Sequence, residues 1–197
     1  VGVGDSVENS YGYRVRIADI DGDGVKDLLV SADNRRGPAT LDIFKGRSGW
    51  TFDKHAYSQR LDSQTTELAN IFYFDVADIN VDGRFDISSP KNGDSTALFL
   101  GRTDSIISRP SFFFVNPNRQ LYGGMGTAMD IGDVNRDGRR DFVITAGTAL
   151  SACVLLCLGH PGVSQLPVAS RCKGFITSGF DPVVNVGDQN GDGVDDF

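Results

Sequence analysis

The chain has 197 residues, of which 40% are hydrophobic, and a formal net charge of −7. This length suits one domain or part of one. The acidic balance argues against a phosphate-backbone partner, which would require clustered Lys and Arg, so we expect no nucleic acid partner. No apolar run reaches the roughly 18 residues of a membrane span, and we expect none in this chain.

The first part of the chain contains four strand-like stretches and one acidic loop. The 24 Gly and 13 Phe residues favour short strands and tight turns over long helices. The strand-like stretches are residues 13–18, 28–32, 41–49 and 50–58. The acidic loop, residues 19–27, joins the first two of them. We therefore predict a unit of four short antiparallel strands.

The same order of elements recurs further along the chain. The second unit has strand-like stretches at 71–77, 87–90, 96–104 and 111–115, with its acidic loop at 78–86. The third unit has them at 127–132, 142–146, 153–162 and 172–178, with its loop at 133–141. A fourth unit begins with the stretch 182–187 and the loop 188–196. Four antiparallel strands in a repeat of this length predict an all-β fold built of β-propeller blades.

The four loops share one pattern, D-x-[DN]-x-D-G-x-x-D. They read D-I-D-G-D-G-V-K-D, D-I-N-V-D-G-R-F-D, D-V-N-R-D-G-R-R-D and D-Q-N-G-D-G-V-D-D. Their first Asp residues are separated by 59, 55 and 55 positions, a spacing typical of repeat proteins.

On these loops and their flanking strands the chain resembles the FG-GAP repeat family, the calcium-binding blades of the integrin alpha-subunit propeller and its relatives. The Phe-Gly element of the family corresponds to Tyr11-Gly12 and Gly124-Met125-Gly126. The Gly-Ala-Pro element corresponds to Ser31-Ala32-Asp33, Ser88-Ser89-Pro90 and Thr145-Ala146-Gly147. These short elements depart from the family pattern, whereas the loops follow it.

The resemblance implies that residues 1–197 are part of a seven-bladed propeller. We expect about three blades, at approximately 11–60, 70–116 and 124–178, and the start of a fourth at 180–197. Phe197 takes the place of Leu28, the first apolar residue after the first loop. The remaining blades are then expected in the same parent chain or in another chain.

The loop composition predicts calcium sites, because Ca²⁺ binds six to eight oxygen ligands. Side chains at positions 1, 3, 5 and 9 of each loop would supply oxygens, Gly at position 6 would permit a sharp turn, and position 7 would offer its backbone carbonyl. The candidate ligands are Asp19, Asp21, Asp23, Val25 and Asp27; Asp78, Asn80, Asp82, Arg84 and Asp86; Asp133, Asn135, Asp137, Arg139 and Asp141; and Asp188, Asn190, Asp192, Val194 and Asp196. We expect three to four Ca²⁺ ions.

Two other interpretations of the loops are weaker. An EF-hand needs a bidentate Glu at position 12 and a helix on each side, but position 12 here is Val30, Ser89 or Ile144. Asp-rich turns without a metal would place several carboxylates close together with nothing to offset their repulsion. Magnesium is less suitable than calcium because it prefers a smaller octahedral shell and keeps its waters.

The three cysteines, Cys153, Cys157 and Cys172, leave two alternatives open. Cys157 could meet Cys172 across the last two strands and form an extracellular disulfide, or all three could be buried thiols. His55 and His160 are isolated, and no catalytic constellation is present, so we expect no enzymatic activity.

The family resemblance implies a calcium-stabilised recognition module at the cell surface or outside the cell, with structural metal sites and a protein or glycan ligand. The adhesion or ligand-binding function is the first hypothesis. The alternatives are a glycan-binding lectin, an accessory domain of an enzyme, and a structural subunit of a large extracellular or organellar assembly.

Overall fold

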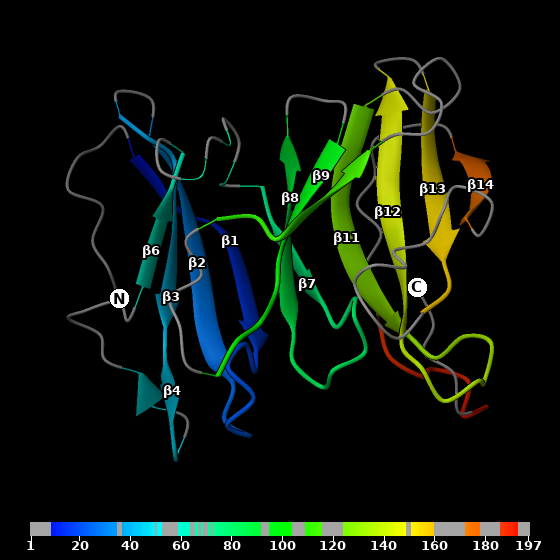
Figure 1. Cartoon of the computed structure of the whole chain (residues 1–197), viewed down its shortest axis with the longest axis horizontal. Coiled ribbons are helices and arrows are strands. Elements are labelled where there is room, and N and C mark those ends of the chain that lie inside the picture. The colour runs from blue at the N-terminus through cyan, green and yellow to red at the C-terminus, as the bar shows by residue number, and fades with distance from the viewer. Residues whose placement is uncertain are drawn as a thin grey trace.

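The structure is a computed structural model. All the regular secondary structure among the residues that it describes is β-strand. The structure describes residues 9–34, 37–49, 51–52, 59–63, 66, 68, 71, 73–91, 95–103, 109–115, 124–148, 151–159, 172–177 and 186–192. Within these residues the chain is all-β, and no helix there could cross a membrane. Three four-stranded antiparallel sheets stand side by side along the long axis (Figure 1).

The first sheet has the strand order β1-β2-β3-β6. Its strands are β1 (Asn9–Ala18), β2 (Asp27–Asn34), β3 (Thr40–Phe44) and β6 (Gln59–Asp62). A separate hairpin of β4 (Gly46–Arg47) and β5 (Thr51–Phe52) projects beyond β3.

The prediction that residues 50–58 hold the fourth strand of this sheet is wrong. Thr51 and Phe52 turn back onto Arg47 and Gly46 instead, and the fourth strand follows as β6. Pairing through β6 places Leu61 opposite Leu41, so that both side chains are buried on the same face. The burial of this apolar pair fixes which segment completes the sheet.

The second and third sheets are meanders of the same kind. The second contains β7 (Asp75–Ala77), β8 (Asp86–Lys91), β9 (Ser95–Phe99) and β10 (Phe112–Val115). The third contains β11 (Gly124–Gly132), β12 (Asp141–Thr148), β13 (Ser151–Cys157) and β14 (Cys172–Thr177). The first strands of the three sheets, β1, β7 and β11, lie next to one another.

Apolar side chains fill the space between neighbouring sheets. Leu29 and Leu41 of the first sheet are buried in one cluster with Ile87 and Phe99 of the second and with Phe74, which directly precedes β7. A second cluster joins the other face of the second sheet to the third, and includes Leu98, Phe114, Phe142, Ile144 and Leu155. Because side chains alternate along a strand, the middle sheet can serve both clusters, one with each face.

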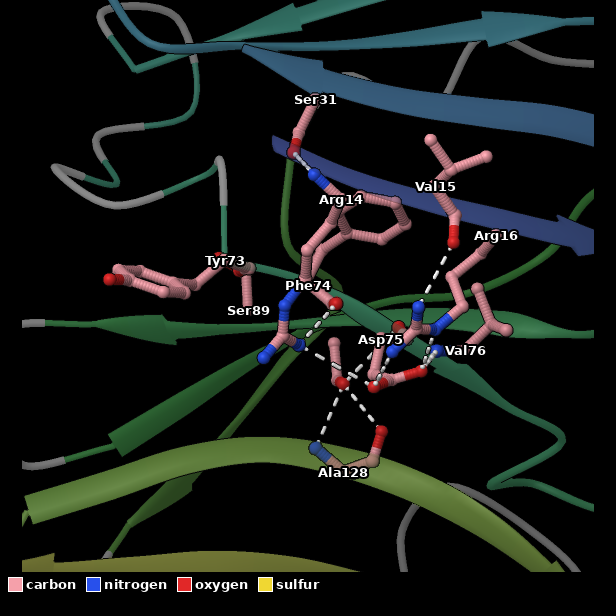
Figure 2. Close-up of polar contacts among 11 residues, drawn as sticks. Arg14, Val15, Arg16, Ser31, Tyr73, Phe74, Asp75, Val76, Ser89 and Ala128 are labelled. Carbon is pink, nitrogen blue, oxygen red and sulfur yellow. Dashed lines mark hydrogen bonds and ion pairs between the residues drawn. The ribbon is translucent and has the colours of Figure 1, made fainter. Parts of the chain in front are cut away.

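Ionic contacts tie the first sheet to the second (Figure 2). The guanidinium of Arg16 donates from Nε and Nη2 to the two carboxylate oxygens of Asp75, at 2.8 and 2.9 Å. Arg14 donates from Nη1 to the carbonyl of Phe74 at 2.9 Å. Two parallel bonds hold a planar guanidinium in one orientation, so this contact fixes β1 against β7 as well as binding them together.

A buried hydroxyl ties the second sheet to the third. Ser88 Oγ accepts from the Ala128 amide at 2.9 Å and donates to the Ala128 carbonyl at 2.8 Å. Both backbone groups of Ala128 are thereby satisfied away from water. The sheets are thus held in a set relation, and the loops that leave their first strands emerge at one end of the molecule (Figure 1).

Candidate metal centre

Each of the first three acidic loops links the first strand of a sheet to the second. Position 1 follows the last residue of the first strand, and position 9 is the first residue of the next strand. The fourth loop is described through Asp192 and lies at the same end as the others (Figure 1). Both ends of the first three loops are therefore anchored in sheet, which holds their carboxylates in place.

The position 1 carboxylate gathers the amides of its own loop. In the first loop Asp19 accepts from the amides of Gly22 at 2.7 Å, Asp23 at 3.1 Å and Gly24 at 2.9 Å. The corresponding bonds run from Asp82 and Gly83 to Asp78, from Asp137 and Gly138 to Asp133, and from Gly191 and Asp192 to Asp188. The described parts of the four loops thus share one backbone path.

Position 6 is where the path turns sharply. Gly24, Gly83 and Gly138 have φ angles of 82°, 86° and 84°. Side chains rarely tolerate this left-handed region, so the Gly expected there is needed for the turn. Position 4 is left-handed as well, and there the second and third loops carry Val81 and Arg136 at 58° and 59°.

Positions 3 and 5 face each other across the loop. The position 5 amides of Asp82 and Asp137 donate to the side-chain oxygens of Asn80 and Asn135, at 3.1 and 2.9 Å. In the first loop, where position 3 is Asp21, the oxygens of Asp19, Asp21 and Asp27 lie within 4.8 Å of one another. Three carboxylate oxygens at this separation are a suitable donor set for a hard cation such as Ca²⁺.

The position 9 carboxylates are buried, and each accepts hydrogen bonds from two backbone amides. Asp27 accepts from the Ile20 amide at 3.1 Å and from the Gly46 amide at 2.8 Å. The equivalent bonds to Asp86 come from Ile79 and Gly101, and those to Asp141 come from Val134 and Gly159. Each carboxylate therefore links two segments by hydrogen bonds: the start of its loop, and the Gly that follows the third strand of its sheet.

The three glycines whose amides donate to the position 9 carboxylates were not predicted from the sequence as part of the site. A Cβ on Gly46, Gly101 or Gly159 would lie 2.1, 2.5 or 2.1 Å from the position 8 carbonyl of its loop, too close for any side chain. The signal was present, because a Gly stands two residues after Phe44, Phe99 and Cys157 in every unit. Its meaning depends on a contact between segments that are distant in the chain.

Burial raises the pKa of these carboxyl groups. The pKa of Asp86 rises to about 7, and those of Asp27 and Asp141 also rise, in each case chiefly because burial penalises the charged form. The pKa of Asp78 rises for the same reason. Backbone amides only partly offset this, so a divalent cation would restore the charged state that burial disfavours.

Cationic side chains also contact the loops. The Lys45 ammonium contacts Asp21 and lies 3.1 Å from Asp23 Oδ2. The Val25 amide and then this ammonium lower the pKa of Asp23. Arg84 binds Asp82 through Nη2 and donates from Nε to the Gly101 carbonyl at 3.1 Å.

The structure tests only part of the predictions for position 7 and for the fourth loop. The position 7 amides of Val25, Arg84 and Arg139 donate to the position 5 carboxylates, and a ligand role for their carbonyls stays a prediction. Val194 and Asp196 lie outside the described residues, while Asp188, Asn190 and Asp192 are exposed.

The structure also covers only part of the prediction for the three cysteines. Cys157 is buried and stands opposite Cys172 in the β13–β14 register. The side chains of Cys153 and Cys172 lie outside the described residues, so the disulfide stays a prediction.

Comparison with known proteins found no matching family model. Among curated proteins, the chain is similar to integrin alpha-IIb of Mus musculus, with 30% identity over 198 residues, covering 86% of this chain and 18% of the relative. It is also similar to integrin alpha-PS3 of Drosophila melanogaster, with 26% identity over 162 residues, covering 74% of this chain and 14% of the relative. The chain thus spans less than a fifth of each of these relatives.

Two solved structures share the fold. The exotype rhamnogalacturonan lyase YesX superimposes with a TM-score of 0.54 at 16% identity, covering 95% of this chain and 38% of the lyase. The Bacillus licheniformis rhamnogalacturonan lyase PL11 gives 0.53 at 17% identity, covering 98% and 40%. At such identities the likeness concerns the arrangement of strands alone. The repeated loops and the integrin matches together show that this chain belongs to an integrin-like, FG-GAP-like family.

Proposed function

We propose that the chain forms blades of a calcium-stabilised β-propeller that serves as a recognition module outside the cell or at its surface. One observation carries the proposal. The acidic loop pattern occurs four times, and the hydrogen bond from its position 5 amide to its position 1 carboxylate recurs each time at the same end of the molecule. The matched relatives are integrin alpha subunits, which favours adhesion to a protein or glycan ligand.

The metal would be held by positions 1, 3, 5 and 9 of the loops. Ca²⁺ supplies positive charge that offsets the repulsion and burial of these carboxylates, and it takes no part in a reaction. The protein prepares the site, because backbone amides already orient the position 1 and position 9 carboxylates. We propose three to four such ions.

A propeller requires further blades, and the first sheet has a face suited to one. Val15 and Ile17 stand four and two residues before the first Asp of their loop, and their exposed fractions are 46% and 47%. Phe74 and Val76 hold the same places in the second unit, where the first sheet covers them and leaves 0% and 9% exposed. We propose that another blade, in the same parent chain or another chain, covers the face with Val15 and Ile17.

A chelator experiment tests the calcium proposal. Ca²⁺ at one hundred times its Kd should add about 2.7 kcal/mol per independent site to the free energy of unfolding. For a chain of this size that raises Tm by about 5–11 °C per site. Thermal melts in Ca²⁺ and in chelator measure the shift. An unchanged Tm would refute the proposal that the ions stabilise the fold.

A loop variant tests the assignment of the ligands. Asp137→Ala removes the position 5 carboxylate of the third loop, so calorimetry should show one fewer Ca²⁺ ion or a weaker site. The same stoichiometry and affinity as the parent protein would show that the ligand assignment is wrong.

We further propose that this chain is not an enzyme. The carboxylates that could act as acids or bases in the described loops accept bonds from their own backbone, as expected of structural metal sites. Because two lyases share the fold, rhamnogalacturonan is the substrate to test. Cleavage of this polysaccharide by the purified chain, lost in Asp137→Ala, would overturn the proposal.

A further inference from the structure

The first loop differs from the second and third at two places that face each other. Position 3 is Asp21 in the first loop, whereas it is Asn in the other two. The residue just before the Gly that donates to the position 9 carboxylate is Lys45 in the first unit, and it is Leu100 and Leu158 in the other two. The unit with one more carboxylate in its loop thus also has a Lys at the place where the other two units have a Leu.

The backbone of Lys45 is fixed beside the loop. Its neighbour Gly46 donates its amide to Asp27 at 2.8 Å and packs against the Lys26 carbonyl so closely that no Cβ would fit. The Lys45 side chain must therefore start at the rim of the loop, whatever rotamer it adopts. From there its ammonium contacts Asp21 Oδ2 and lies 3.1 Å from Asp23 Oδ2.

This ammonium occupies the same carboxylates that the candidate metal would use. Asp21 is one of the three residues whose oxygens lie within 4.8 Å of one another, and Asp23 is the position 5 residue of the same loop. The side chain of Lys45 is 51% exposed, so its long stem can carry the charge away into water. A cation held this way can neutralise the loop and can also be displaced from it.

We propose that Lys45 is an internal competitor for the first calcium site, holding Asp21 and Asp23 until a divalent cation displaces its ammonium. The inference rests on the proposed calcium function. Two cations close together repel each other, so the ammonium has to leave before the metal binds. Lys45 therefore lowers the calcium affinity of the first loop. At low calcium its ammonium remains the partner of Asp21, the additional carboxylate of this loop.

Exchanging Lys45 for the residue of the other units tests this competition. A calcium titration of the full chain can be followed by the NMR signals of the position 6 amides, Gly24, Gly83 and Gly138, one for each loop. Lys45→Leu should lower the Kd reported by Gly24 by about five- to tenfold, the effect of losing two exposed ion pairs, and leave the other two Kd values unchanged.

Lys26→Leu is the matched control. Lys26 is exposed at position 8 of the same loop, and no ion pair of its ammonium is described. Its removal takes away the same charge, so it should change the Kd reported by Gly24 by less than about twofold. An equal effect of the two variants would overturn the proposal, because the effect would then be one of net charge. The proposal would also be overturned if Lys45→Leu left the Kd reported by Gly24 unchanged or raised it.

A second measurement needs no variant. Acylation of amines followed by mass spectrometry should show Lys45 becoming more reactive when calcium is added, relative to Lys26. Reactivity of Lys45 that calcium does not raise, while the Gly24 signal still shifts, would overturn the competition and leave calcium binding intact. If the Gly24 signal shifts in none of the proteins, the calcium function of this loop fails as well.

Discussion

Replacing Gly101 by Ala should disrupt the end of the molecule that carries the loops. Gly101 lies where the first and second loops meet, and its amide donates to the buried carboxylate of Asp86 at 2.9 Å. A Cβ at this position would lie 2.5 Å from the Phe85 carbonyl oxygen and 2.6 Å from the Ile20 carbonyl oxygen. The two carbonyls belong to different loops, so a shift of either loop alone relieves only one of the two close contacts.

The cost follows from these distances. The carbonyls would have to move apart by about 0.5–1 Å to reach ordinary contact, and overpacking of this kind costs about 1–3 kcal/mol. Moving the chain also weakens the bond to Asp86, and a hydrogen bond to a charged group contributes about 1.5–3 kcal/mol. Together we expect a loss of about 3–5 kcal/mol, or a fall in Tm of about 6–20 °C.

Gly83→Ala, in the second loop, is the matched control. Gly83 has a φ of 86°, and a Cβ there would have no atom within 4 Å, so only the backbone conformation is penalised. That penalty is about 1–2 kcal/mol. Urea unfolding of the two variants in chelator separates the effects. If Gly101→Ala is no more destabilising than Gly83→Ala, the close approach does not govern the stability of this junction.

Two further predictions concern the second loop without calcium. Because the pKa of Asp86 is about 7 in the folded chain and about 3.9 when unfolded, the folded state holds the extra proton between these values. The free energy of unfolding in chelator should therefore fall as pH rises from about 4 to about 7, and urea titrations of Asp86→Asn should show a weaker fall; an equal slope in the variant would assign the effect to other groups. Val81→Gly should stabilise the chain by about 1 kcal/mol, since Val81 has a φ of 58° that a β-branched residue adopts only with strain. A destabilised variant in the same urea assay would mean that the Val81 side chain contributes more than its strain costs.

Much of the site was predictable because its information is local. Asp at positions 1 and 9, and Gly at position 6, appear at fixed spacing in every loop, and in the first three loops the structure gives the Gly the expected sharp turn. The strands on either side were also predictable, since alternating apolar residues end directly before each first Asp. The all-β antiparallel arrangement follows from the same patterns.

The errors and omissions share a physical cause. Residues 50–58 are apolar and aromatic enough for a strand, but the pairing that buries Leu61 beside Leu41 placed the strand later. Arg16 and Asp75 are 59 positions apart and form their two bonds only when β1 and β7 lie side by side. Neither outcome can be inferred from a pattern within one segment, because each depends on which faces meet.

The sequence by itself determined the pattern of each loop, its oxygen-rich composition and the strand character of its flanks, because each depends on residues within about ten positions of one another. Only the tertiary structure decided which carboxylates are buried, which glycines admit no side chain, and which cationic side chains contact the loops. Burial and close approach are properties of surfaces brought together by folding. The ammonium of Lys45, 24 positions from Asp21 in the chain, came to the rim of the first loop because Gly46 packs against the Lys26 carbonyl.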